Sequence, residues 1–324
     1  MNQERFSSFV ETAVNHAHIA EFVVAIPAIF INLFHLCILL NASMRTSSTN
    51  SILIGIAISD LVVLAVVLYD RVMQFWFTKT LDCNQITGEI QWIHDLQRDI
   101  LEQTSFWLGV FLAFNRLLIM KLPQKYQWVS NPICGYFVVL GLFTLSIVLS
   151  ALFYFLVHFN AFVKIPGSEC SEASDDLVER LVTLELVSGS SQILISLIYP
   201  ILAVFLITLI KKSTTNEAAQ SKKSTIERHR SAKMILIMTM LYVICSAPCG
   251  IMDFLQLFIH ENTFLEVLAT YGSTFVALFF CLNSISHCLL SFAMSSKYRE
   301  TAKSIWRTAK IRDTVLVKPS GDQK

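Results

Sequence analysis

Charged side chains occur within or beside long apolar stretches at three places in this sequence. Asp60 lies near the centre of one stretch, Asp99 and Glu102 lie at the start of another at a spacing of three, and Arg116 lies near its end. A carboxylate in apolar surroundings needs a polar partner or a cation, and two carboxylates on one helix face could bind a cationic ligand. The guanidinium of Arg116 could anchor a helix end at a water interface or bind polar groups in a cleft between helices.

The stretches that hold these residues indicate an integral membrane protein. Hydrophobic residues make up 54% of the 324 residues and charged residues only 15%, which is atypical of water-soluble domains. Crossing a bilayer requires about 20 apolar residues. Suitable stretches span 22–40, 51–69, 100–120, 135–157, 186–210, 234–258 and 267–293. We therefore predict an all-α membrane protein built as a bundle of seven transmembrane helices.

The distribution of lysine and arginine predicts how this bundle is oriented. Basic residues are concentrated after the first, third, fifth and seventh stretches, as in Arg45, Lys121 and the segment 211–233. Because basic residues are enriched on the cytoplasmic side, we predict a multi-pass protein of the plasma membrane. Its predicted parts are an extracellular amino terminus over 1–20, a transmembrane domain over 21–293 and a cytoplasmic tail over 294–324.

Acidic residues are concentrated on the predicted outer side, where Glu21, Asp70 and Asp99 are among those at or near the outer face. An acidic mouth would attract cationic ligands by long-range electrostatics. Charge segregation across a membrane alone would give the same pattern, so both interpretations remain open.

Cysteine positions predict one disulfide. Of the eight cysteines only Cys83 and Cys170 fall in outward loops, where disulfides persist. We therefore predict a bridge between Cys83 and Cys170. It would restrict the segment before the third helix and the loop between the fourth and fifth.

Two prolines mark places where predicted helices could bend. Pro200 lies in the fifth stretch and Pro248 in the sixth. A proline removes a backbone hydrogen bond and permits a kink, so Pro248 is a candidate hinge.

The third helix should begin before residue 100. At about 1.5 Å per residue, Glu102 would lie roughly 21 Å from Arg116, a depth that suits a ligand cavity in the outer half of the bundle.

The segment after Ser295 predicts a short amphipathic eighth helix. Tyr298, Ala302, Ile305 and Trp306 share one face at helical spacing, and basic residues cover the rest. This pattern is typical of a helix that lies on the inner leaflet.

Taken together, these landmarks resemble the rhodopsin-like G-protein-coupled receptors, over residues 32 to about 312. Asn32 and Asp60 resemble the polar residues of that family's first two helices, and Asn115-Arg116-Leu117 followed by Pro123 resembles its Asp-Arg-Tyr motif. The other matching residues are Cys83, Cys170, Pro200 and Pro248. The resemblance implies a receptor that has no cofactor and contacts a heterotrimeric G protein near Arg116.

Short motifs support a narrower resemblance. They are Asn32-x-x-His35, Met44-Arg45-Thr46-Ser47-Ser48, Trp107-Leu108, Leu282-Asn283-Ser284 and Met294-Ser295-x-x-Tyr298-Arg299. These motifs resemble the nematode serpentine receptors of class W, which are similar to receptors for FMRFamide-like peptides and myosuppressin. This resemblance implies a peptide ligand.

The sequence departs from the family pattern at the predicted cytoplasmic side. Asn115 replaces the acid that precedes the arginine, and Arg228 replaces the acid that often holds the third helix to the sixth. We therefore predict a weak contact in the inactive state and raised basal signalling.

Further departures occur within the bundle. Ser246 replaces the usual toggle tryptophan, and His287-Cys288-Leu289-Leu290-Ser291 replaces the Asn-Pro-x-x-Tyr motif. Ser105 and Asn283 keep the polar set that holds sodium near Asp60 in relatives. His287 could instead supply its own positive charge there, and no other metal is expected.

We predict a receptor for a cationic, amidated, FMRFamide-like peptide. The candidate ligand-binding residues are Arg98, Asp99, Glu102, Glu185, Gln192, Asp253 and Gln256. The carboxylates would bind an arginine of the peptide, and the glutamines would bind its amide. Asp99 and Glu102 could equally be structural partners of Arg98 and Arg180. Alternative functions are a receptor for a small environmental chemical and an orphan with impaired signalling.

Other function classes fit less well. A retinal pump requires a lysine in the seventh stretch, which has none. Transporters often consist of paired halves with broken helices, and the sequence shows no such repeat. The histidines are too scattered for a metal set. We expect neither an enzyme nor a nucleic-acid partner, and the expected partners are a peptide, a G protein and the lipid bilayer.

Overall fold

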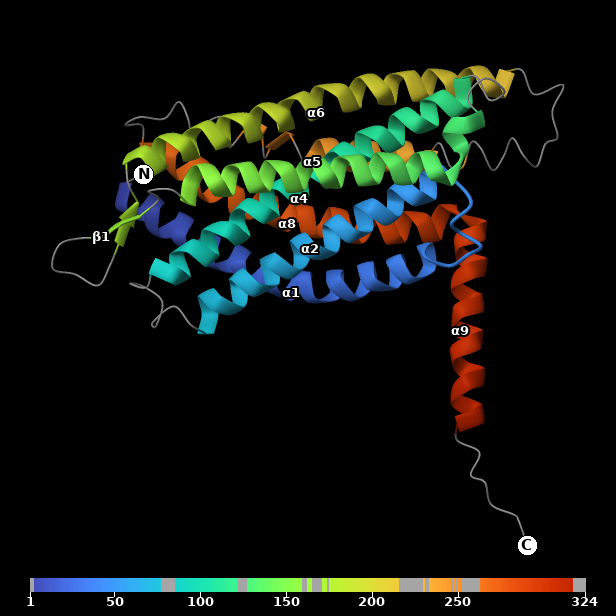
Figure 1. The fold of residues 1–324 in the computed structure, drawn as a ribbon, viewed down its shortest axis with the longest axis horizontal. Coiled ribbons are helices and arrows are strands. Elements are labelled where there is room, and N and C mark those ends of the chain that lie inside the picture. Colours follow the sequence, from blue (N-terminus) through green and yellow to red (C-terminus); the bar gives the residue numbers. More distant parts are fainter. Residues whose placement is uncertain are drawn as a thin grey trace, which may run out of the picture.

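The chain folds into a bundle of long helices, with one helix running across its end (Figure 1). The computed structural model describes residues 3–76, 85–121, 127–158, 162–164, 171–173, 175–215, 230, 233–245, 247–248, 250–251 and 263–316. Most of these residues are helical. The amino terminus lies at one end of the bundle and helix α9 at the other, so we call these the amino-terminal end and the α9 end.

The helices of the bundle correspond to the predicted apolar stretches. The long ones are α1 (Gln3–Leu39), α2 (Ser48–Trp76), α4 (Gln85–Lys121), α5 (Pro132–His158), α6 (Asp175–Thr215) and α8 (Thr263–Met294). Between α6 and α8 lies Lys233–Cys245, a shorter apolar helix. Residues 247–248 and 250–251 are also helical, and together with it they form what we call the sixth-helix segment. Helix α9 (Ser296–Leu316) follows α8, and a short 3-10 helix, η1 (Gln127–Ser130), precedes α5.

The predicted all-α membrane fold is confirmed. Among the residues that the structure describes, six helices are long and apolar enough to cross a membrane. The sixth-helix segment contains one more apolar helix, which is shorter and corresponds to the predicted sixth stretch. The predicted eighth helix is α9. It runs across the end of the bundle, as a helix on a membrane surface must.

The helix boundaries differ most at the amino terminus. The predicted first helix begins at Phe22, whereas α1 begins at Gln3. The third helix was expected to begin before Ile100, and α4 begins at Gln85. The residues before Phe22 form a helix because Val14, Ala17 and Glu21 recur at helical spacing and are all buried.

Two short strands form a hairpin that the sequence did not predict. Strand β1 (Phe162–Lys164) pairs antiparallel with β2 (Ser171–Ala173), with Phe162 opposite Ala173. The hairpin lies at the amino-terminal end of the bundle (Figure 1).

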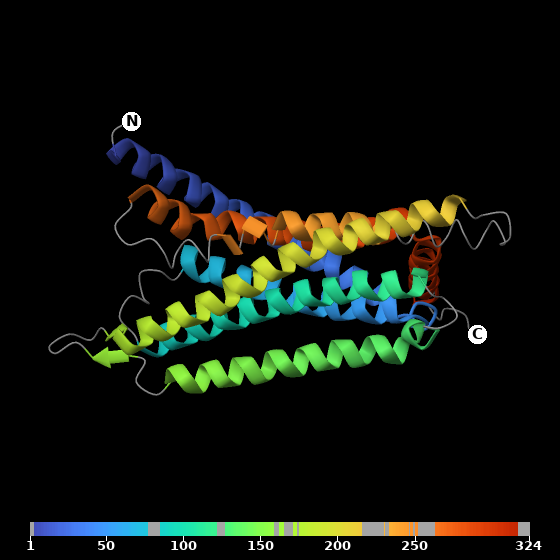
Figure 2. The same cartoon turned by 90° about the horizontal axis from the view of Figure 1, so that it is seen from above.

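Helix α2 is central and α5 is peripheral. In their most apolar parts, 67% of the α2 residues are buried inside the protein but only 11% of the α5 residues. Figure 2 shows α5 (green) at the edge of the bundle. It still packs closely on α2 because residue 135 is glycine, where a Cβ would lie 2.5 Å from the carbonyl oxygen of Ser48.

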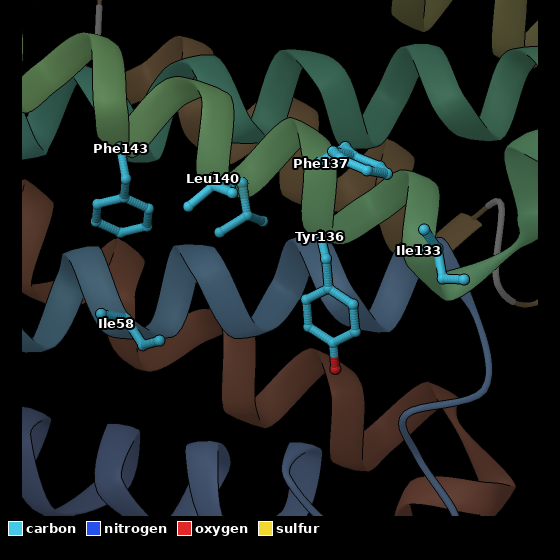
Figure 3. Close-up of a pocket in the computed structure, with 7 residues that line it drawn as sticks. Ile58, Ile133, Tyr136, Phe137, Leu140 and Phe143 are labelled. Carbon is cyan, nitrogen blue, oxygen red and sulfur yellow. The ribbon is translucent and has the colours of Figure 1, made fainter.

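An apolar groove of about 510 Å³ lies between α2 and α5 (Figure 3). It is lined by Ile58, Ile133, Tyr136, Phe137, Val139, Leu140 and Phe143. These residues offer a polar ligand only the Tyr136 hydroxyl, and most of them are exposed on the membrane-facing side of α5. The groove is therefore a poor candidate for recognition of a polar ligand.

Two buried apolar clusters form the core. One contains Ile38, Leu112 and Tyr298 and joins the bundle to α9. The other contains Leu64, Phe106, Tyr199, Tyr242 and Phe280 and lies further toward the amino-terminal end. Asp60 falls in α2 between Ala57 of the first cluster and Val63 of the second. Along α2, a polar layer therefore lies between the two apolar clusters.

Candidate functional site

The polar layer is centred on Asp60, whose side chain is fully buried. Ser105 of α4 donates a hydrogen bond to Asp60 Oδ1 over 2.7 Å. His287 of α8 places Nε2 3.7 Å from Asp60 Oδ2. Asn283 Nδ2 lies 3.4 Å from the same imidazole nitrogen. The structure thus brings together four residues that sequence reasoning selected.

Asn32 connects the first helix to this layer. Its Nδ2 donates to Ser284 Oγ over 2.6 Å and to the Ala28 carbonyl over 3.2 Å. Ser284 lies next to Asn283 on α8, and all three side chains are buried. Unpaired polar groups are costly inside a membrane. These contacts therefore join α1, α2, α4 and α8 at one level of the bundle.

His287 occupies one side of the Asp60 carboxylate. Among the described residues, no group of three or more His, Cys, Asp or Glu side chains could hold one. Sodium prefers oxygen ligands, as hard cations do; the Ser105 hydroxyl contacts Asp60 Oδ1, whereas an imidazole nitrogen lies beside Oδ2. The imidazole and a cation would compete for the same side of the carboxylate.

At the α9 end, Asn115 contacts α2. Its Nδ2 donates to Ser48 Oγ over 2.8 Å, and both side chains are buried. Arg116 is half-buried near the end of α4. The other two candidates for G-protein coupling, Pro123 and Arg228, lie outside the described residues.

The sixth-helix segment places Pro248 in helical conformation with an intermediate exposure. Two residues further, Gly250 lies against α6, where an added Cβ would be 3.0 Å from the Cβ of Gln192. The segment is thus packed tightly on α6 beside its proline. Ser246 lies outside the described residues.

In the half of the bundle nearer the amino-terminal end, α4 and α6 are joined by a hydrogen bond. Trp107 Nε1 donates to Ser191 Oγ over 3.1 Å. Glu102 on α4 and Gln192 on α6 lie near this contact along their helices, and both side chains are buried. This is the part of the predicted ligand site that the structure describes best.

Arg98 and Asp99 are neighbours in a weak ion pair. Arg98 Nε lies 3.9 Å from Asp99 Oδ1, and the Asp99 side chain is 49% exposed. This pair supports the structural role that the sequence left open for Asp99. Glu185 lies on α6, but its side chain is outside the described residues, as are Asp253, Gln256, Cys83 and Cys170.

Sequence reasoning missed a buried ion pair between α1 and α2. Glu21 Oε2 lies 2.9 Å from Arg71 Nε and 3.5 Å from His18 Nδ1. Because its side chain is fully buried, Glu21 serves here as a partner of Arg71, and the acidic mouth stays a prediction. The signal available in the sequence was the apolar type of Val14 and Ala17, which share a helix face with Glu21.

Helix α9 is held to the bundle by polar contacts. Tyr298 Oη and His35 Nδ1 are hydrogen-bonded over 2.7 Å. Ser43 Oγ and Thr301 Oγ1 are 3.0 Å apart, and Lys297 Nζ donates to Thr46 Oγ1 over 2.8 Å. Burial raises the pKa of the Tyr298 phenol, so it remains protonated at neutral pH.

Comparison with known proteins identifies a family. A family model described as "Serpentine type 7TM GPCR chemoreceptor Srw" matches residues 19–309. A search of curated proteins finds no match. The predicted resemblance to serpentine receptors of class W is confirmed, whereas the match does not support the further resemblance to FMRFamide-like peptide and myosuppressin receptors.

Proposed function

Because the chain belongs to the Srw family of serpentine seven-transmembrane G-protein-coupled chemoreceptors, we propose that it detects a small environmental chemical. The family is one of membrane receptors rather than enzymes, and its class implies a heterotrimeric G protein as partner. The proposal places the chain in the plasma membrane, with the amino-terminal end outside and the α9 end in the cytoplasm. The distribution of basic residues supports that orientation.

Recognition is proposed to involve Glu102 and Gln192. They are the two candidate ligand residues with buried, described side chains, and they lie on α4 and α6 beside the Trp107–Ser191 hydrogen bond. A carboxylate and an amide in a water-poor site discriminate strongly between ligands that satisfy them and ligands that do not. We therefore expect a ligand with a cationic or hydrogen-bond-donating group. This group of the ligand would displace the protein groups that contact Glu102.

A cationic peptide is the second candidate, and the exposure of Asp99 favours it. Asp99 lies about one helical turn further out than Glu102 and is 49% exposed. An extended ligand could contact both carboxylates, whereas a small molecule bound at Glu102 would leave Asp99 in solvent. The FMRFamide-like ligand belongs to this second candidate.

Signalling is proposed to follow a shift between two pre-existing conformations. The ligand would favour the one in which the sixth-helix segment swings about Pro248 and opens a cleft near Arg116. Asn115 supports high basal activity in this scheme, because a neutral amide cannot neutralise the adjacent guanidinium. The size of the response is limited by the difference in ligand affinity between the two conformations.

His287 is proposed to take the place of sodium beside Asp60. The 3.7 Å distance from its Nε2 to Asp60 Oδ2 supports this assignment. In its protonated form the imidazole would supply the positive charge that a sodium ion supplies in relatives.

The experiment that tests the proposed ligand class uses cells that express the chain with promiscuous G proteins. A library of small amines and neutral volatiles is compared with a panel of cationic amidated peptides. We expect a small amine to activate, and Glu102→Gln to raise its half-maximal concentration about tenfold or more. Asp99→Asn should leave that response unchanged. Activation by peptides alone, weakened by Asp99→Asn, would replace the chemosensory proposal with the peptide one.

A further inference from the structure

One side chain of the sixth-helix segment, Tyr242, contacts three other helices. Its ring stacks on that of Tyr199 of α6, with centroids 5.3 Å apart and planes at 5°. Phe106 of α4 meets it edge to face at 5.7 Å, and His287 of α8 lies 5.2 Å away. Tyr199, Tyr242, Phe106 and His287 are all buried. The position of this ring therefore depends on α4, α6 and α8 together.

The ring pair fits against α4 because residue 109 is glycine. An alanine Cβ at Gly109 would lie 2.7 Å from Cε2 and 2.9 Å from Cζ of Tyr242, and it would overlap Oη of Tyr199. Carbon atoms in proteins do not approach this closely. Both rings are buried and rigid, so they could make room only by moving the helices that carry them.

Tyr199 is fixed against α4 by its hydroxyl group. Its Oη donates to the carbonyl oxygen of Phe106 over 2.7 Å. A helical carbonyl has a second lone pair for such a bond. Tyr199 also directly precedes Pro200, so the anchor lies beside the point where α6 can bend.

We propose that Gly109, Tyr199 and Tyr242 are positioning residues that set the separation of α4 and the sixth-helix segment. The inference rests on the proposed function, because movement of that segment is the proposed signal. Tyr242 also contacts His287, which lies 3.7 Å from Asp60. The aromatic contact therefore links the polar layer to the segment that moves. Overpacking at residue 109 would push the segment outward without any ligand.

The test measures the distance between the α4 end and the sixth-helix segment in full-length receptor in lipid nanodiscs. Spin labels are placed at Lys121 and Lys233, which are both exposed. The labels are attached through unnatural amino acids, because labels that react with cysteine would also modify the exposed Cys37. The variants are Gly109→Ala, Tyr199→Phe and their combination. The matched control is Gly141→Ala, since a Cβ at residue 141 of α5 meets nothing within 4 Å.

We expect Gly109→Ala to increase the ratio of long to short distances about fivefold, the effect expected of one methyl group that overpacks a core. Tyr199→Phe should give a smaller increase. The double variant should lie closer to the parent than Gly109→Ala does, since it lacks the hydroxyl that overlaps the new methyl group. Gly141→Ala should match the parent.

Parent-like distances in Gly109→Ala would overturn the inference. If that variant does not reach the membrane, Tyr199→Phe decides alone: an increase in long distances supports the inference, and an unchanged distribution overturns it. The distance is measured without a G protein. An outward shift without a change in nucleotide exchange would therefore count against the proposed function and not against this aromatic contact.

Discussion

Asn115 near the end of α4 donates a hydrogen bond to Ser48 at the start of α2, over 2.8 Å between Nδ2 and Oγ. The residue that precedes Arg116 thus serves to join two helices. An acid at this position could neutralise the arginine, whereas the amide instead satisfies a buried hydroxyl. This relationship gives the predicted high basal activity a structural cause.

The first prediction concerns Asn115→Asp. A carboxylate beside Arg116 should favour the inactive conformation by about 1 kcal/mol, a typical value for a partly exposed charge pair, and lower basal signalling about fivefold. Basal nucleotide exchange per receptor at the cell surface measures this. Ser48→Ala is the control, because it removes the partner of Asn115 without adding charge and should not lower the basal rate. Unchanged basal exchange in Asn115→Asp would refute the idea of a weakened inactive state.

The second prediction concerns sodium. If His287 takes the place of the cation, the melting temperature of the parent should be the same in sodium chloride and in N-methylglucamine chloride. His287→Asn opens that side of Asp60 to an ion, and sodium should then raise the melting temperature by about 3 °C for each kcal/mol of binding free energy. Asp60→Asn added to His287→Asn should abolish the sodium effect. A sodium effect in the parent that persists in His287→Asn would contradict the assignment.

The third prediction concerns the docking of α9. Tyr298→Phe removes the hydrogen bond to His35 and leaves a buried imidazole nitrogen without that partner, at a cost of about 2 kcal/mol. Amide hydrogen exchange in α9 should then rise more than tenfold. Trp306→Ala is the control, since its side chain is 73% exposed and should leave exchange nearly unchanged. Equal exchange in Tyr298→Phe and the parent would show that this bond does not hold α9.

The fourth prediction concerns the buried ion pair of α1 and α2. Glu21→Gln leaves the Arg71 guanidinium without its carboxylate and should cost about 3–5 kcal/mol, lowering the melting temperature by about 10 °C. Glu21→Gln combined with Arg71→Gln should recover part of the loss. Asp99→Asn, which alters an exposed pair, should cost less than about 1 kcal/mol. A Glu21→Gln receptor as stable as the parent would mean that the pair contributes little.

Much of the fold could be predicted because a bilayer imposes a minimum length on apolar helices. The seven stretches follow from that constraint, and the amphipathic tail follows from the spacing typical of a helix at a membrane surface. Asp99 and Glu102 correctly indicated that α4 begins early. The start of α1 was missed because His18 and Glu21 suggest solvent. Glu21 is buried and His18 is partly buried, because Glu21 pairs with Arg71 of α2 and with His18.

The internal contacts of the site could be predicted less well. Protein-facing and lipid-facing residues are equally apolar in a membrane helix, so hydrophobic periodicity does not reveal which face Tyr199 or Tyr242 occupies. Asp60, Ser105, Asn283 and His287 could be grouped because charged and polar residues in such helices must face one another. Two further contacts, of Asn115 with Ser48 and of His35 with Tyr298, join residues that are far apart in the sequence. The motifs that contain these residues do not show which of them come together.

The most direct test of the central claim is nucleotide exchange by a panel of purified heterotrimeric G proteins in the presence of the receptor in lipid nanodiscs. No ligand is needed, because the account predicts high basal activity. We expect the parent to accelerate exchange on at least one G protein, and Arg116→Ala to reduce the rate to that of empty nanodiscs. A parent that accelerates none of them, or an Arg116→Ala variant that retains the full rate, would contradict the account.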